Sequence, residues 1–393
     1  MRKIKESILV LNNRNLIIFT IIFTKLLATV FTLLIVDKFT PLIDARMYQD
    51  GLYKLEFITL RTYIVQQTAN FISYFTHPLA SHYFFSLFSS LGLIWFVRAY
   101  NPKWYILFIL LLPTSMIWTS VISKESIYYL FFSILLILWI KIIHNEFKVK
   151  HLFALIISIS ICMILRPHYM VCIFWIYWVA IILNNVTNYK LILFGTYFLI
   201  VLMILTIVFF GHYIDSYWGT NLFDFKTRAF TAISFEGNAS RFIELGFTPE
   251  ILNNVHSEEI VSNQISQNFN SMMNNLFFVG FIYGIIGPFY EEVINRFEFI
   301  PFFIEGVIIM SFPIIIFIRM LIIQKNIFNN INFLNYVYGL FPAIILVMIV
   351  HAFFGLFNPG TAIRWRINFE LIFYFAPFLL YFKNLEIKNE KNN

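Results

Sequence analysis

The sequence predicts an all-α integral membrane protein that crosses the bilayer about ten times. Of its 393 residues, 60% are hydrophobic and only 12% are charged, and the mean hydropathy is +0.76. A soluble domain carries about 25% charged residues. The hydrophobic residues gather in runs near the length of about 20 residues that a helix needs to cross a hydrocarbon core about 30 Å thick. We therefore expect one membrane domain, 1–393, rather than several soluble domains.

Apolar windows mark the predicted spans. The N-terminal run MRKIKESILVLNNRN is basic and no small-residue cleavage site follows it, so the first window is predicted to be an uncleaved span rather than a signal peptide. A further stretch, 276–290, is interrupted by Gly284, Gly287 and Pro288, and we expect it to be re-entrant or interfacial. The spans are predicted at 16–36, 80–97, 104–121, 127–143, 152–165, 169–184, 191–210, 300–318, 333–351 and 369–382.

The distribution of charge predicts the orientation. The net charge is +7, and the basic residues lie in short connections between the apolar windows rather than in one patch, which argues against a nucleic-acid partner. If both termini are cytoplasmic, the inner segments hold more than half of the Lys and Arg residues but few acids. This is the asymmetry of the positive-inside rule. The sequence therefore predicts a multi-pass protein of the bacterial inner membrane with both termini in the cytoplasm.

With this orientation, three long segments face the periplasm. They are 37–78, 211–299 with its interrupted stretch, and 352–368. A polar run from His256 to Asn275 within the second segment is predicted to be an amphipathic helix on the outer surface, with a simple solvated cap as the alternative. Long loops tend to carry function whereas short ones connect, so we expect the functional side chains on the outer face.

Several classes of site are not indicated. Cys162 and Cys172 both lie in apolar segments, so neither a disulfide framework nor a metal cluster is supported. The chain has no phosphate-binding Walker loop, no nucleophile elbow, no zinc-binding HExxH motif and no glycine-rich dinucleotide fingerprint. We therefore expect no cofactor and no metal.

The first outer segment offers a carboxylate and a phenol. Asp44 and Tyr48 are four residues apart, so one helical turn would bring them together beyond the outer end of the first span. A carboxylate in this place is suited to act as a base toward a hydroxyl group. The alternative is an exposed start of a helix with no chemical role.

The stretch PTSMIWTSVISKES, 113–126, ends an apolar run with hydroxyls and a Lys–Glu pair. Ser120 and Lys124 share one face if the helix continues through them. Lys124 and Glu125 then lie at the outer boundary, where we expect Lys124 to bind substrate and Glu125 to act as a base. The alternative is that both only mark the membrane interface.

Outer arginines are the predicted anion ligands, because a guanidinium fork matches two oxygens of a phosphate. Arg166 and His168 lie in a proline-interrupted turn between two spans, where His168 is a further candidate base. A membrane-anchoring role of Arg166 is the alternative. Arg364 and Arg366 follow the turn Asn-Pro-Gly; on an extended backbone they would face one side, whereas on a helix they diverge by about 200°. The second outer segment contributes Arg228 and Arg241.

Together these motifs resemble those of polytopic bacterial envelope glycosyltransferases. They are Asp-x-x-x-Tyr in an early outer segment, the P-x-S-x-x-W-x-S end of a span followed by Lys-Glu, Arg-x-His between spans, and a late Arg-x-Arg. The pattern is similar to that of the Wzy-type repeat-unit polymerases of O-antigen and capsule synthesis and of related GT-C-like enzymes. It covers most of the chain as an architecture, although each motif is short.

The resemblance implies a substrate and a reaction. Such enzymes take a glycan from undecaprenyl diphosphate and transfer it, on the periplasmic face, to an acceptor sugar on a second lipid-linked unit, without a nucleotide sugar. A flippase and a chain-length regulator of the same pathway are the implied partners. GT-C enzymes often carry paired acids in the first loop and a metal, whereas Asp44 is followed by Ala45 and Arg46, which argues against a metal. Two alternatives remain: a transferase that adds a single branch sugar, and a flippase or transporter of the lipid-linked glycan.

Overall fold

The computed structural model of the chain is built from helices. It describes residues 2–39, 43–51, 60–100, 102, 104, 107, 112–186, 188–199, 201–202, 281–288, 290–323, 330–356 and 359–392. The structure is mostly helical, at 89%, and the described ranges contain no strand. This confirms the all-α prediction at the level of secondary structure.

Six helices in this part of the chain are long and apolar enough to cross a membrane. Two shorter apolar helices, Val149–Leu165 and Tyr189–Leu199, add to them. The apolar character of these helices supports a multi-pass membrane protein, whereas the total of ten spans and the orientation stay predictions. The six candidate spans are Arg14–Val36, Pro78–Tyr100, Lys124–Ile143, Pro167–Asn185, Phe297–Ile322 and Ile331–His351.

By contact the chain divides into two compact units. Unit 1 comprises Met1–Ala180, Val307–Ile344 and Arg366–Asn393, and unit 2 comprises Ile181–Gly306 and Ile345–Trp365.

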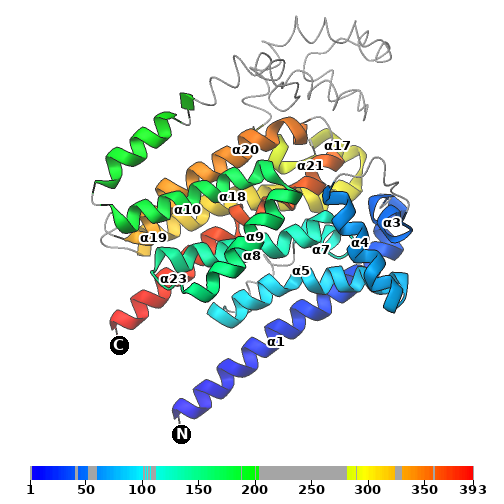
Figure 1. Cartoon of the computed structure of the whole chain (residues 1–393), viewed down its shortest axis with the longest axis horizontal. Coiled ribbons are helices and arrows are strands. Elements are labelled where there is room, and N and C mark those ends of the chain that lie inside the picture. Colours follow the sequence, from blue (N-terminus) through cyan, green and yellow to red (C-terminus); the bar gives the residue numbers. More distant parts are fainter. Residues whose placement is uncertain are drawn as a thin grey trace, which may run out of the picture. The chain divides into compact units, whose positions relative to one another are not determined.

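The centre of unit 1 is the helix α8 (Lys124–Ile143). It packs against α5, α9 and α23, and α5 in turn packs against α1 and α4 (Figure 1). Of the six candidate spans α8 has the largest buried share, 78% of its apolar window, which explains why it is hydrophobic on all sides rather than amphipathic. The bounds of its neighbours are α1 (Arg2–Phe31), α4 (Leu60–Phe75), α5 (Pro78–Tyr100), α9 (Val149–Leu165) and α23 (Phe375–Asn392).

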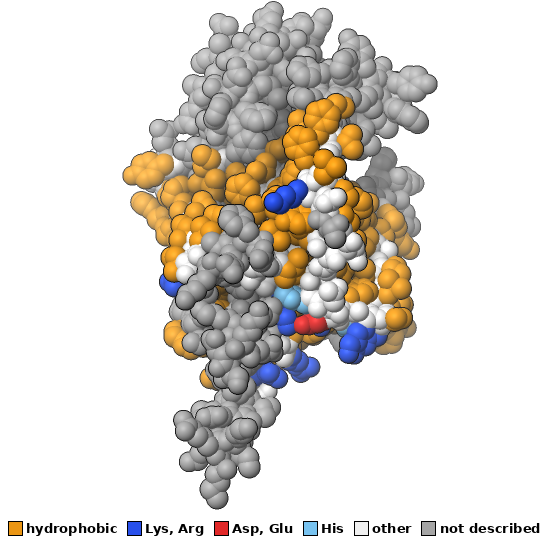
Figure 2. All heavy atoms as spheres, turned by 90° about the vertical axis from the view of Figure 1, so that its left-hand side faces the viewer, with side chains coloured by type: hydrophobic (Ala, Val, Ile, Leu, Met, Phe, Trp, Pro, Cys, Tyr) orange, Lys and Arg blue, Asp and Glu red, His pale blue; other side chains and the backbone are white. Residues whose placement is uncertain are grey.

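The outward surface of the helices is apolar. On α1, Leu16, Phe19, Phe23 and Leu27 are all at least half exposed at intervals of three or four residues. Figure 2 shows one face on which hydrophobic side chains dominate the described surface, while most of the few charged side chains lie at its lower edge. Such a surface is expected of helices that face lipid rather than water.

Two predicted spans are interrupted. In the window 104–121 the described part holds α7 (Pro113–Trp118), and the chain is then not helical until α8 begins at Lys124. In the window 369–382, α22 (Glu370–Phe373) is separated from α23 at Tyr374. The window predicted to end at residue 121 therefore extends beyond the end of α7 at Trp118. The reason is the local density of Ser and Thr, whose hydroxyls offer hydrogen bonds that compete with the helical ladder.

Unit 2 contains a sharp break at Gly287. There α16 (Phe281–Ile286) ends before α17 (Tyr290–Asn295), and Gly287 has a φ of +93°, a conformation that favours glycine. A Cβ at Gly287 would also lie 3.2 Å from Cγ1 of Ile363, so the backbone approaches this side chain closely. Whether this stretch re-enters the membrane stays a prediction, and residues 276–280 lie outside the described part.

The described part of the chain contains further helices. They are α3 (Ile43–Gln49), α10 (Met170–Asn185), α18 (Ile300–Ile323), α19 (Ile331–Leu334), α20 (Phe341–Leu356) and α21 (Pro359–Arg366).

Candidate functional site

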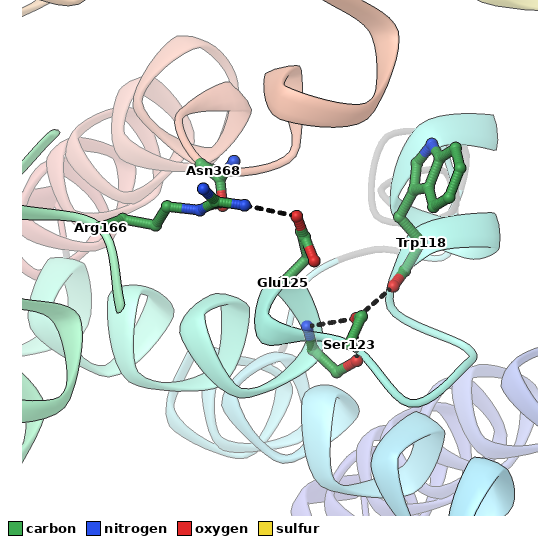
Figure 3. Close-up of polar contacts among 6 residues, drawn as sticks. Trp118, Ser123, Glu125, Arg166 and Asn368 are labelled. Carbon is green, nitrogen blue, oxygen red and sulfur yellow. Dashed lines mark hydrogen bonds and ion pairs between the residues drawn. The ribbon is translucent and has the colours of Figure 1, made fainter. Parts of the chain in front are cut away.

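The segment before α8 is irregular, and its own side chains hold it in place. Ser123 is the N-cap of α8: its backbone is extended and its Oγ accepts a hydrogen bond from the Ser126 backbone N–H at 3.1 Å. The same hydroxyl donates to the carbonyl oxygen of Trp118 at 2.8 Å (Figure 3). One serine thus joins the end of α7 to the start of α8, and it fixes where Lys124 and Glu125 begin their helix.

Neighbouring helices hold the segment from outside. The backbone N–H of Ile122 donates to Nδ1 of His82 at 3.3 Å, so the ring proton lies on Nε2, which donates to Oε1 of Gln49 at 2.8 Å. Lys25 of α1 donates to the Ser115 carbonyl at 3.1 Å and to the Thr119 hydroxyl. The ammonium group therefore caps the carboxyl end of α7, where the helix dipole favours a cation.

The centre of the site is an ion pair between Glu125 and Arg166. Arg166 Nη2 lies 2.6 Å from Glu125 Oε1, and the two side chains are 5% and 0% exposed. Arg166 Nε donates to Oδ1 of Asn368 at 3.2 Å, so the guanidinium is held from two sides (Figure 3). Arg166 lies where α9 ends and the short turn Pro167–Tyr169 begins. The proline therefore places the arginine at a helix end, as the sequence predicts.

Helix α3 brings the predicted carboxylate and phenol to the same place. Asp44 and Tyr48 both lie on α3, and the Tyr48 side chain is fully buried. The Lys124 ammonium lies over the Tyr48 ring, 5.9 Å from its centroid. Glu125, Arg166, Arg61 and Asp44 are the charged groups that act on Lys124. This arrangement brings side chains from the first outer segment to the start of α8.

Arg61 is a member of the site that the sequence does not single out. It is the second residue of α4, and its side chain is half-buried. Burial, followed by the charge of Arg166, lowers the pKa of the Arg61 guanidinium, while Tyr48 and Glu125 act in the opposite direction. An arginine remains protonated at physiological pH despite such a shift. Arg61 lies in a predicted outer segment against the positive-inside tendency, the same signal that singles out Arg364 and Arg366.

We call the group of polar and charged side chains around the start of α8 the α8 cluster. Its cations are Arg61, Lys124 and Arg166 and its carboxylates are Asp44 and Glu125, which gives a formal net charge of 3 − 2 = +1. In surroundings of low dielectric constant an excess positive charge attracts anions much more strongly than in water. The start of α8 adds the positive end of a helix dipole. The complete cluster is Asp44, Tyr48, Arg61, Lys124, Glu125, Arg166 and Asn368.

A second polar group lies buried in the same unit, and we call it the inner polar group. Arg366 Nη2 donates to the Thr114 hydroxyl at 2.8 Å, and the Tyr129 and Tyr374 hydroxyls are 2.8 Å apart. Tyr374 also donates to Glu370 Oε1 at 3.3 Å, and Glu370 acts electrostatically on Lys25. The Lys25 ammonium lies 5.7 Å from the centroid of the Tyr129 ring. The members of the group are Lys25, Thr114, Tyr129, Arg366, Glu370 and Tyr374.

The two groups share their supporting segments. The stretch 113–125 supplies Thr114 to the inner polar group and Lys124 and Glu125 to the α8 cluster. The stretch 366–370 supplies Arg366 and Glu370 to the inner polar group and Asn368 to the α8 cluster. A movement of either stretch would therefore affect both groups.

The structure brings some of the predicted site residues together. Asp44, Tyr48, Lys124, Glu125 and Arg166 come together in the α8 cluster. The helix does not continue through residues 119–123, so the condition under which Ser120 would share a helix face with Lys124 is not met. Metal-ligand groups of three or more His, Cys, Asp or Glu are not found among the described residues.

The described contacts of His168 and Arg366 are with residues outside the α8 cluster. The His168 ring is half-buried and packs on Tyr169, with ring centroids 4.3 Å apart. Arg364 and Arg366 lie on the helix α21, so their side chains diverge. Arg366 is fully buried in the inner polar group, whereas Arg364 is half-buried and belongs to unit 2. Arg228, Arg241 and the amphipathic helix predicted after His256 lie outside the described residues.

No protein-family model, no curated protein and no solved structure matches this chain. The chemistry of the α8 cluster is therefore what indicates its function.

Proposed function

We propose that the chain is a membrane glycosyltransferase that polymerises oligosaccharide repeat units carried on undecaprenyl diphosphate, as the Wzy-type enzymes do. The observation that carries the proposal is the α8 cluster, in which two carboxylates lie among three cations with an excess of one positive charge. An apolar helix bundle around such a cluster suits a substrate with a lipid tail and an anionic head.

The chemistry of transfer fits these residues. As the glycosidic bond to the lipid breaks, negative charge develops on the diphosphate leaving group. Arg166 and Lys124 are cations at the start of α8 and Arg61 interacts with both electrostatically, and preorganised cations stabilise such charge in the transition state. Asp44 or Glu125 then accepts the proton of the acceptor hydroxyl. The reaction needs neither a nucleotide sugar nor a resident cofactor.

The position of the cluster within unit 1 also supports the proposal. The N-terminal end of α1 and the C-terminal end of α23 lie toward one end of this unit, while α3 and α7 lie at the opposite end (Figure 1). If both termini are cytoplasmic, as the positive-inside rule predicts, the start of α8 faces the periplasm. Lipid-linked repeat units are polymerised on that face.

A deletion strain tests the proposal. Loss of long surface chains, with a single repeat unit still displayed, is the result expected of a polymerase. Complementation with Arg166→Ala should fail to restore the chains, while a variant of the lipid-facing surface, Phe19→Leu, should restore them. A changed sugar composition at unchanged chain length would instead indicate a branch-sugar transferase.

Transport of the lipid-linked glycan is a second candidate, and the inner polar group favours it. Transporters place ionisable residues and interrupted helices near the middle of the membrane. Lys25 lies at the middle of the candidate span Arg14–Val36, and the helix breaks at 119–123 and at Tyr374 adjoin the inner polar group. Accumulation of lipid-linked units on the cytoplasmic face of the deletion strain would support transport and contradict the polymerase.

A further inference from the structure

Glu125 occupies the place on Arg166 that an anionic substrate would need. Arg166 donates from Nη2 to the Glu125 carboxylate at 2.6 Å, and both side chains are almost fully buried. That nitrogen is thus already engaged, and the neighbouring Nε is engaged with Asn368. A phosphate oxygen that binds the Nε–Nη2 edge of the guanidinium therefore has to share or replace the carboxylate.

We propose that the substrate's diphosphate displaces Glu125 from Arg166, so that Glu125 inhibits the site until the donor is bound and becomes the base once it is released. The proposal rests on the proposed function and concerns the regulation of that same site. The incoming ligand is an organic diphosphate, and the displaced group is the chain's own carboxylate.

The contacts of Arg166 make the exchange feasible. Removing one partner of a buried ion pair is strongly unfavourable when nothing replaces it. A diphosphate replaces it with more negative charge and with oxygens that match the guanidinium fork. The bond from Nε to Asn368 does not involve Glu125, so it keeps the guanidinium oriented during the exchange.

The displaced carboxylate remains next to cations. Lys124 precedes Glu125 in the chain and lies over the Tyr48 ring, and Glu125 also acts on Arg61. The released carboxylate thus stays near positive charge without the direct guanidinium bond that it makes to Arg166, so its charge is not isolated in an apolar interior.

Release changes what Glu125 can do. A carboxylate bonded to a guanidinium is a weak base, because protonation would cost the ion pair. Once released, it accepts the proton of the acceptor hydroxyl while that oxygen forms its bond to the anomeric carbon. The bond from the anomeric carbon to the diphosphate oxygen breaks, and its electron pair leaves with the diphosphate. Activation of the acceptor thus waits for the donor.

Binding of inorganic pyrophosphate to the full-length detergent-solubilised chain tests the competition. Glu125→Gln keeps the shape of the side chain and removes its charge, so we expect it to bind pyrophosphate at least about tenfold more tightly than the wild type, while it loses transfer activity. Asp44→Asn is the matched control, because it removes one negative charge of the cluster that is not bonded to Arg166 in a described contact. Its gain in pyrophosphate affinity should be clearly smaller than that of Glu125→Gln.

The outcomes separate the inference from the proposed function. Equal or weaker pyrophosphate binding by Glu125→Gln than by the wild type would overturn the displacement. If Arg166→Gln loses pyrophosphate binding in the same experiment, Arg166 is still an anion ligand and the proposed function stands. If the wild type and all variants fail to bind, both the anion site and the displacement are refuted.

A second measurement uses the wild type, in case Glu125→Gln does not fold. A hydrophobic carbodiimide modifies carboxyl groups that are not held in an ion pair, and mass spectrometry locates the adduct. We expect modification of Glu125 to rise severalfold when pyrophosphate is added. Unchanged or reduced modification would contradict the displacement.

Discussion

The guanidinium of Arg366 donates to the hydroxyl of Thr114 at 2.8 Å, which joins two segments 252 residues apart in the chain. Both residues are fully buried. A hydrogen bond to a charged group contributes about 1.5–3 kcal/mol, and a buried donor that loses its acceptor pays its full desolvation. This contact therefore ties the start of α7 to the segment that also carries Asn368 and Glu370.

Replacing Thr114 tests this bond. Thr114→Val keeps the volume and removes the hydroxyl, so we expect unfolding free energy to fall by about 1–3 kcal/mol. Thr114→Ser keeps the hydroxyl and is the matched control, with a much smaller loss. Melting temperatures of the purified protein in detergent measure both. A Thr114→Val variant as stable as the control would show that the bond contributes nothing.

The Tyr48 ring is expected to matter more than its hydroxyl. Lys124 lies over the face of this ring, and a cation over an aromatic face gains about 0.5–2 kcal/mol depending on burial. Tyr48→Phe should therefore support nearly normal glycan chain length, whereas Tyr48→Leu should shorten the chains. The length distribution of surface glycan in a complemented deletion strain is the measurement. If Tyr48→Phe fails as badly as Tyr48→Leu, the phenol itself takes part in binding.

Gly92 is expected to be essential for the contact between α5 and α8. A Cβ at this position would overlap the Ser133 side chain, approaching its Cβ to 2.9 Å and the Leu130 carbonyl oxygen to 3.3 Å. Overpacking of this kind costs about 1–3 kcal/mol. Gly92→Ala should therefore lower the melting temperature by several degrees.

Gly195 provides the control for this substitution. It lies in the helix Tyr189–Leu199, and a Cβ there meets no atom within 4 Å. Gly195→Ala should leave the melting temperature unchanged or raise it slightly, because alanine has the higher helix propensity. Equal effects of the two substitutions would mean that α5 and α8 are not packed as closely as described.

The membrane class and part of the site are predictable from sequence because they depend on local patterns. Apolar runs of sufficient length follow from what a bilayer requires of a helix. The placement of Asp44 and Tyr48 four residues apart on one helix needs only the helical period, and the proline after Arg166 marks its helix end. Each of these inferences involves residues within a few positions of one another.

The remainder of the site depends on contacts between distant segments. Hydropathy does not report the break at 119–123, because the groups that hold this stretch, Lys25 and His82, lie on other helices. Asn368 reaches Arg166 across 202 residues, and no local pattern of the sequence indicates it. The ion pair between Glu125 and Arg166 likewise joins two residues that the sequence predicts only separately.

The pair of Glu146 and Lys383 predicts a dependence of stability on pH. Lys383 Nζ lies 2.7 Å from Glu146 Oε1, and it joins α23 to the turn between α8 and α9. Burial acts to raise the pKa of Glu146, but the hydrogen bond from Lys383 and the charges of Lys383, His144 and Lys141 outweigh it, so this pKa is lowered. The pair therefore stabilises the fold above the ordinary pKa of a glutamate, and its contribution is lost as the pH falls through the lowered pKa.

Melting temperatures of the wild type and of Glu146→Gln measure this contribution. Because Glu146 is 43% exposed, the pair should add only about 0.2–1 kcal/mol near pH 7. The difference between the two proteins should narrow as the pH falls below the ordinary pKa of a glutamate, and it should vanish below the lowered pKa of Glu146, where both proteins carry a neutral side chain. Lys383→Met should reproduce the loss at neutral pH, and combining both substitutions should add little. A difference that stays constant down to the acid limit would mean that the loss in Glu146→Gln does not come from the carboxylate charge.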